Sequence, residues 1–73
     1  MKKTIFDDDY KVFVERLKKA RDEAGLTQVQ VAKKLGATQA YISKVEDGQL
    51  RVDVTQVKKF AKIYGKSIHY FLK

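Results

Sequence analysis

The chain is 73 residues long, so we expect one small domain and exclude a separate ligand-binding domain or a multi-domain enzyme. Its 16 Lys and Arg against 9 Asp and Glu give a net charge of +7, which favours a polyanionic partner, with nucleic acid ahead of an acidic membrane. A hydrophobic content of 44% indicates a folded domain, while the absence of Cys and the single His, His69, exclude a disulfide framework and a Cys/His zinc site.

Glycines at positions 25, 36, 48 and 65, together with the absence of Pro, divide the chain into segments that can all be helical. Residues 1–10 are expected to form a short N-terminal arm, and residues 11–73 the folded domain. A first helix is expected from about Asp9 to Ala24, because apolar residues recur along it at the period of one helix face.

Capping signals bound the next two helices. Thr27 and Gln30 have the spacing of a capping box, which predicts a helix over residues 28–35. Thr38 is predicted to be the N-cap of a third helix, from Gln39 to about Asp47.

The last two helices follow the same logic. Asp53 is predicted to cap a fourth helix that ends at Gly65 and buries a face beginning with Val54, and Ser67 to cap a short fifth helix over residues 68–72. The side chains expected in the core are Phe13, Leu17, Val31, Ile42, Val45, Val57, Phe60 and Phe71.

Only three residues, 36–38, separate the second and third helices, and this connection forces a sharp crossing. Gly36 supplies a backbone conformation that other residues resist, and the small side chain of Ala32 lets the third helix approach the second. The spacing predicts a helix-turn-helix unit, with an ordinary helical hairpin inside a bundle as the structural alternative.

These segments resemble the Cro/C1-type helix-turn-helix family, also called the XRE family, over roughly residues 13–72. The matching motifs are Leu26-Thr27-Gln28, Val31-Ala32, Leu35-Gly36, Tyr41-Ile42-Ser43-Lys44 and Glu46-x-Gly48. The resemblance implies an all-α, compact five-helix bundle of the lambda-repressor-like type, with the helix-turn-helix at helices two and three. Many members have a Pro in the loop before the fourth helix, where this chain has Arg51-Val52-Asp53, and some carry a polar base-reading residue in place of Ala40.

The resemblance also implies how DNA would be contacted, since the third helix of this architecture lies in the major groove. A Gln side chain can form hydrogen bonds with an adenine edge, a Lys side chain can do so with guanine, and a methyl group can pack against the thymine methyl. The base-reading residues are therefore expected to be Gln39, Ala40, Ser43 and Lys44. A surrounding ring of hydrogen-bond donors and one cation gives as phosphate-binding residues Gln28, Thr38, Tyr41 and Arg51.

Two further sets have structural roles. In related domains the positions of Arg21 and Glu46 form a partly buried ion pair, and we assign them that role here. Ile63, His69 and Tyr70 are hard to bury in one small domain and are interpreted as a dimer interface. Scattered surface apolar residues are the alternative for each of these three taken alone.

The sequence therefore predicts a DNA-binding transcriptional regulator, a homodimeric repressor of a near-palindromic operator. An antitoxin or protein-interaction module with the same fold is the alternative, and a toxin or other protein partner stays open. No catalytic site, cofactor or metal is expected. The lack of any long apolar run or signal peptide argues against a membrane, and the lack of Cys favours the cytoplasm, where the protein would associate with the nucleoid.

Overall fold

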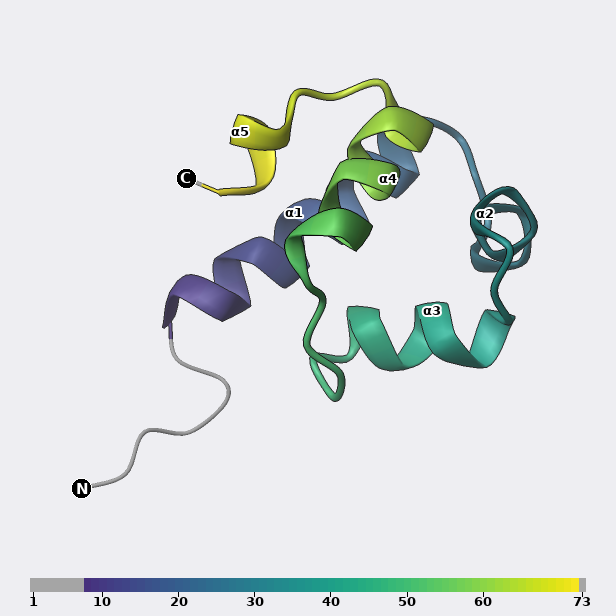
Figure 1. The fold of residues 1–73 in the computed structure, drawn as a ribbon, viewed down its shortest axis with the longest axis horizontal. Helices are drawn as coiled ribbons and strands as arrows, with labels where there is room; N and C mark the ends of the chain where they lie inside the picture. Colours follow the sequence, from purple (N-terminus) through teal and green to yellow (C-terminus); the bar gives the residue numbers. More distant parts are fainter. Residues whose placement is uncertain (1–7, 73) are drawn as a thin grey trace.

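The computed structural model describes residues 8–72, which form five α-helices and contain no strand (Figure 1). The helices are α1 (Asp8–Glu23), α2 (Gln28–Leu35), α3 (Gln39–Glu46), α4 (Val54–Tyr64) and α5 (Ile68–Phe71). The predicted all-α, five-helix architecture is confirmed. Residues 1–7 of the expected arm lie outside the described residues, whereas residues 8–10 belong to α1.

The predicted caps set the helix boundaries. The hydroxyl of Thr27 accepts the N–H of Gln30, and the Gln30 side chain accepts the N–H of Thr27, so the capping box is complete. Thr38 caps α3 by accepting an N–H in the same way. Asp53 and Ser67 do so for α4 and α5. These short helices begin where an oxygen-bearing side chain satisfies an amide that has no intrahelical partner.

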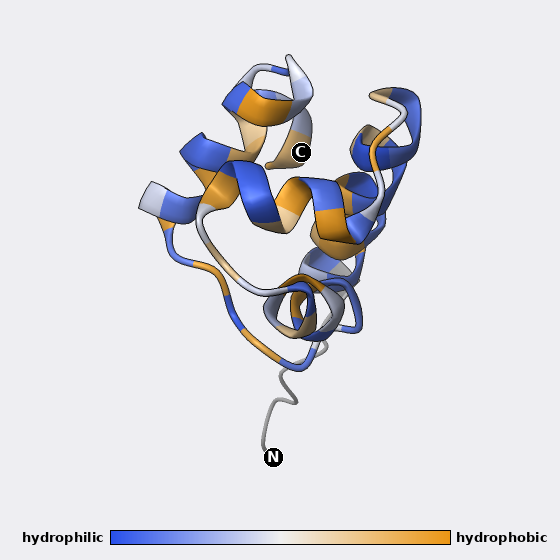
Figure 2. Cartoon of the chain, turned by 90° about the vertical axis from the view of Figure 1, so that its right-hand side faces the viewer, coloured by the Kyte–Doolittle hydropathy of each residue, from blue (hydrophilic) through white to orange (hydrophobic). Residues whose placement is uncertain are grey.

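The core forms where all five helices meet. α1 contacts α3, α4 and α5, while α2 contacts α3 and α4. Hydrophobic and hydrophilic segments alternate along the helix ribbons, as expected when each helix turns one face inward (Figure 2). All the expected core side chains are buried, and the cluster also includes Val14, Ala20, Ala32, Ala61 and Tyr64.

Two residues of α4 differ in solvent exposure from the sequence-based expectation. Val54, predicted on the buried face, is 59% exposed because it is the first residue of the helix. Ile63, which lies off the main apolar stripe, is half-buried and packs against the core. The stripe on α4 is therefore broad near its C-terminal end and absent at its first residue.

One buried polar atom stands out among the described residues. The hydroxyl of Tyr64 is buried and has no hydrogen-bond partner within this part of the chain. Burial raises the pKa of this hydroxyl well above its ordinary value, so it stays protonated. An unsatisfied buried hydroxyl costs about 1–3 kcal/mol.

We expect Tyr64→Phe to leave the free energy of unfolding unchanged or raise it by about 1 kcal/mol, because the ring packing against Phe60 is retained. Urea unfolding of both proteins measures the change. Tyr41→Phe is the control, since the Tyr41 hydroxyl accepts a hydrogen bond from Gln56 and its removal should be mildly destabilising. A clear loss of stability in Tyr64→Phe would contradict the expectation.

Candidate nucleic-acid interface

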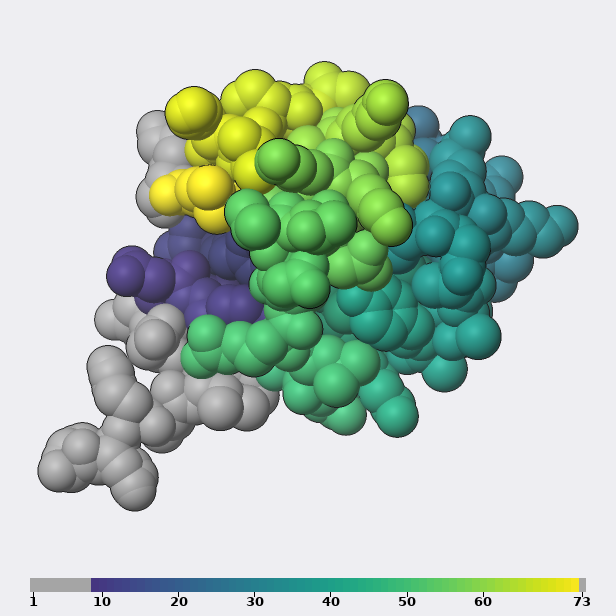
Figure 3. All heavy atoms as spheres, in the orientation of Figure 1, coloured from purple at the N-terminus to yellow at the C-terminus, as the bar shows by residue number. Residues whose placement is uncertain are grey.

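The outward face of α3 is polar and open to solvent. Gln39, Ala40 and Lys44 are exposed and Ser43 is half-exposed, whereas Ile42 and Val45 on the opposite face are fully buried. In the space-filling view, α3 and the loop that follows it form the lower edge of the coloured, described part of the chain (Figure 3). The structure thus brings the four residues interpreted as base readers onto one accessible helix face.

The turn before α3 holds this helix at an angle to α2. Gly36 has a φ of +76°, in the left-handed region, and the N–H of Ala37 bonds to the carbonyl of Ala32 at 2.8 Å. A Cβ built on Gly36 would meet no atom within 4 Å, so backbone conformation and not space explains the glycine. Ala32 is buried at the crossing, as its small size predicts.

The last residue of α3, Glu46, has a buried carboxylate. Glu46 is only 4% exposed, and Arg21 of α1 meets it with two hydrogen bonds, Nε to Oε2 at 2.8 Å and Nη2 to Oε1 at 3.1 Å. Arg21 also donates from Nη1 to the carbonyl of Leu26 at 3.0 Å. The hydrogen bond to Glu46 raises the pKa of the Arg21 guanidinium above its ordinary value, so this side chain keeps its positive charge.

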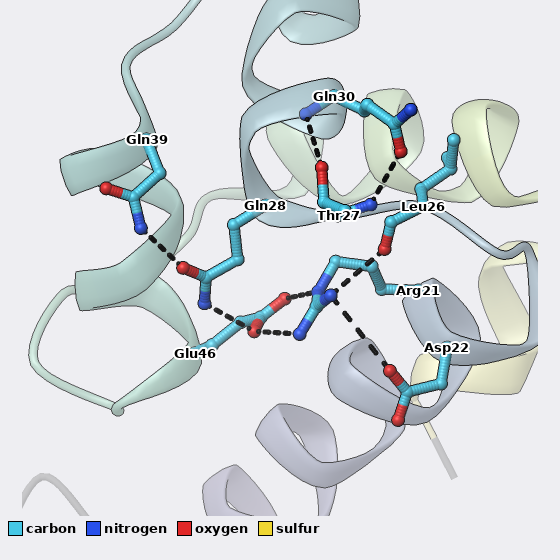
Figure 4. Close-up of polar contacts among 8 residues, drawn as sticks. All are labelled: Arg21, Asp22, Leu26, Thr27, Gln28, Gln30, Gln39 and Glu46. Atoms are coloured by element: carbon cyan, nitrogen blue, oxygen red, sulfur yellow. Dashed lines mark hydrogen bonds and ion pairs between the residues drawn. The ribbon is translucent and has the colours of Figure 1, made fainter.

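Gln28 extends this ion pair to the surface of α3 (Figure 4). Its Nε2 donates to Glu46 Oε1 at 3.0 Å, and its Oε1 accepts from Nε2 of Gln39 at 2.6 Å. A continuous chain of hydrogen bonds therefore runs from Arg21 through Glu46 and Gln28 to Gln39. The Gln28–Gln39 contact was not expected from the sequence, although both residues come directly after an N-cap threonine.

The residues interpreted as phosphate-binding surround α3, and each has an intramolecular contact. The Thr38 hydroxyl accepts the N–H of Tyr41, and the Tyr41 hydroxyl accepts from Nε2 of Gln56 at 3.1 Å. Arg51 is exposed in the loop after α3, with its guanidinium carbon 4.5 Å from the centre of the Tyr10 ring. Tyr10 was not singled out from the sequence, where it is one aromatic residue near the start of the first helix.

Of the three residues interpreted as a dimer interface, Ile63 is near the C-terminal end of α4, and His69 and Tyr70 belong to α5, which lies across the fold from α3 (Figure 1). Ile63 and Tyr70 are half-buried against their own core, and only His69 is exposed. The Tyr70 ring has Lys66 Nζ at 4.7 Å and the Arg16 guanidinium carbon at 5.4 Å from its centre. Much of the surface of the Ile63 and Tyr70 side chains is therefore covered by other residues of the same chain.

The described residues show neither a metal-binding cluster nor a membrane-spanning helix. No group of three or more His, Cys, Asp or Glu side chains in residues 8–72 could hold a metal ion. No helix in this part of the chain is long and apolar enough to cross a membrane.

Comparisons with known proteins agree with the geometry. A family model described as helix-turn-helix matches residues 17–71. The SPbeta prophage-derived uncharacterized HTH-type transcriptional regulator YonR of Bacillus subtilis is 37% identical over 62 residues, covering 85% of this chain and 57% of that protein. A glutamine–fructose-6-phosphate aminotransferase of Methanocaldococcus jannaschii is 37% identical over 51 residues, covering 68% of this chain and 5% of that enzyme. The chain thus spans little more than half of the regulator and a small part of the enzyme. No solved structure matches it.

Proposed function

Because the chain belongs to the helix-turn-helix family of the Cro/C1 type, we propose that it is a sequence-specific double-stranded DNA-binding repressor of transcription. The observation that carries this proposal is the exposed polar face of α3, held outward by a tight turn, in a chain of net charge +7. A helix of this width fits the major groove, and the excess of Lys and Arg favours attraction to the phosphate backbone.

Base reading is assigned to Gln39, Ala40, Ser43 and Lys44. Gln39 lies at the first residue of α3, where recognition helices present side chains to base edges, and its amide can pair with adenine. Lys44 lies more than one turn further along the same exposed face and can reach guanine. The methyl group of Ala40 fits against the methyl group of thymine. The hydroxyl of Ser43 can donate a hydrogen bond to a base edge or accept one from it.

Phosphate binding is assigned to the residues that flank this face. Gln28 is the first residue of α2, where amides without intrahelical partners and the helix dipole attract an anion. Its side chain already bridges Glu46 and Gln39, so this assignment rests mainly on the backbone N–H. Thr38, Tyr41 and Arg51 would contact neighbouring phosphates from the turn, from α3 and from the following loop.

The operator is proposed to be near-palindromic and to bind a homodimer, with recognition helices about 34 Å apart. Because Ile63 and Tyr70 are partly used by their own core, self-association near α5 would depend most on the exposed residues His69 and Leu72, the latter 59% exposed. The relative from Bacillus subtilis is described as a transcriptional regulator, which supports this role over catalysis. The proposed location is the cytoplasm, on the nucleoid.

Selection of bound sites from random duplex DNA tests the proposal. We expect an enriched near-palindromic sequence with half-sites about one helical turn apart, and an affinity that falls steeply as salt is raised. Binding without any enriched sequence would refute the base-reading role. A chain that binds no duplex but captures a protein would favour the interaction-module alternative.

We expect Leu72→Lys to weaken self-association, because it places a charge in the exposed apolar surface beside α5. Sedimentation velocity over a range of concentrations measures the effect. Val29→Lys is the matched control, since Val29 is similarly exposed but lies on α2. Identical sedimentation of Leu72→Lys and the parent chain would remove α5 from the proposed interface.

A further inference from the structure

Tyr10, near the start of α1, contacts the loop between α3 and α4 through two parts of its side chain. Its hydroxyl donates a 2.7 Å hydrogen bond to the backbone carbonyl of Leu50. Its ring lies under the guanidinium of Arg51, whose central carbon is 4.5 Å from the ring centre, the geometry of a cation–π contact. One side chain therefore holds the backbone of one loop residue and the side chain of the next.

The Tyr10 ring packs against the aromatic part of the core. The Tyr10 ring is half-buried, and its centre lies 5.5 Å from that of the buried Phe13 ring, which in turn meets Phe71. Burial raises the pKa of Tyr10, with Arg51 opposing the shift, so the hydroxyl keeps the proton that it donates to Leu50. Packing against the core therefore orients the Tyr10 ring, and the Tyr10 side chain in turn contacts the loop at Leu50 and Arg51.

The loop that carries Arg51 lies beside the C-terminal end of α3, on the edge of the molecule where α3 is exposed (Figures 1 and 3). A guanidinium can stack through its flat face and still direct its N–H groups outward to a phosphate. A long side chain that is already restricted loses less conformational freedom when it binds, so stacking on Tyr10 prepares Arg51 for such a contact.

We propose that Tyr10 is a positioning residue for DNA binding, which holds the loop at Leu50 and presents Arg51 to a phosphate of the duplex. This inference rests on the proposed function and adds a residue to it. Tyr10 precedes the segment matched by the helix-turn-helix family model, residues 17–71, whereas Leu50 and Arg51 lie within it.

A salt series with two duplexes tests the role, one selected by the parent chain and one unrelated duplex of equal length. In a plot of log affinity against log salt, Arg51→Ala should reduce the magnitude of the negative slope by about one, because one phosphate contact is lost. Tyr10→Leu should weaken binding to both duplexes about 2- to 10-fold, and it should also make the dependence of log affinity on log salt less steep. Adding Arg51→Ala to Tyr10→Leu should cost little more, since both changes remove the same contact. Tyr10→Phe keeps the ring and should retain the parent slope.

Two results would overturn the inference: a folded Tyr10→Leu variant with the parent slope, or losses from Tyr10→Leu and Arg51→Ala that simply add. If Tyr10→Leu does not fold, NMR of the parent chain decides. Ring-current shifts on the Arg51 side-chain protons should then be present in the free protein and persist in the complex, and their absence overturns the proposal. A parent chain that binds neither duplex would instead refute the proposed function.

Discussion

Replacing Arg21 by methionine is expected to lower the free energy of unfolding by about 3–5 kcal/mol. The substitution removes both hydrogen bonds from Arg21 to Glu46, whose carboxylate is 4% exposed and would keep, among residues 8–72, the hydrogen bond from Gln28. A buried charge without its partner bears the full cost of leaving water, and a domain of this size has a total stability of only about 5–15 kcal/mol. Urea unfolding followed by circular dichroism measures the loss.

The controls separate charge from packing. Arg16→Met removes another arginine of the same helix, one that donates to the carbonyl of Tyr70, and should cost only about 1 kcal/mol. The double variant Arg21→Met with Glu46→Leu replaces the pair by apolar side chains and should recover much of the lost stability. If Arg21→Met were as stable as Arg16→Met, the ion pair would not have the structural role proposed for it.

Gln39→Ala is expected to weaken binding to the selected operator by about 1–3 kcal/mol and to relax the preference at one base pair. The physical reason is the loss of a side-chain amide at the first residue of α3, where Gln28 holds it by a 2.6 Å hydrogen bond. Competition binding against operator variants, changed one base pair at a time, measures both effects. Equal weakening on all sequences would contradict a base-reading role for Gln39.

The same hydrogen bond predicts coupling between the two glutamines. Gln28→Ala should also weaken operator binding, and the double variant should lose less than the sum of the single losses. Gln49→Ala is the matched control, because Gln49 is exposed in the loop after α3 and should leave the base preference unchanged. Strictly additive losses would show that Gln28 does not orient Gln39 in the complex.

The chain of contacts behind Gln39 gives the proposed recognition surface a fixed base. Arg21 joins α1 to Glu46 of α3, and Gln28 of α2 joins that carboxylate to Gln39. Three helices are therefore tied together at the position where the domain would meet DNA. A side chain held before binding loses less conformational freedom on contact with a base, which favours both affinity and selectivity.

The sequence by itself determined the five helices, with boundaries that differ from the structure by at most about one residue. Caps at Thr27, Thr38, Asp53 and Ser67 act within two or three residues of themselves, so their effect is readable from local spacing. The periodic apolar residues likewise identified the core, because a helix repeats its inward face at a fixed interval. The exposed face of α3 followed from the same periodicity.

Only the tertiary structure decided which polar groups meet and which apolar groups remain exposed. The contacts Gln28–Gln39, Arg21–Glu46 and Tyr10–Leu50 join residues 11, 25 and 40 positions apart, and no local rule relates their side chains. The Arg21–Glu46 pair was inferred from family resemblance, whereas the other two were found only in the structure. Ile63, which lies off the main apolar stripe of α4, is likewise half-buried against the core, whereas Val54 at the first residue of that helix is exposed. Burial depends on which neighbouring helix covers a position, and that is set by the packing of the whole domain.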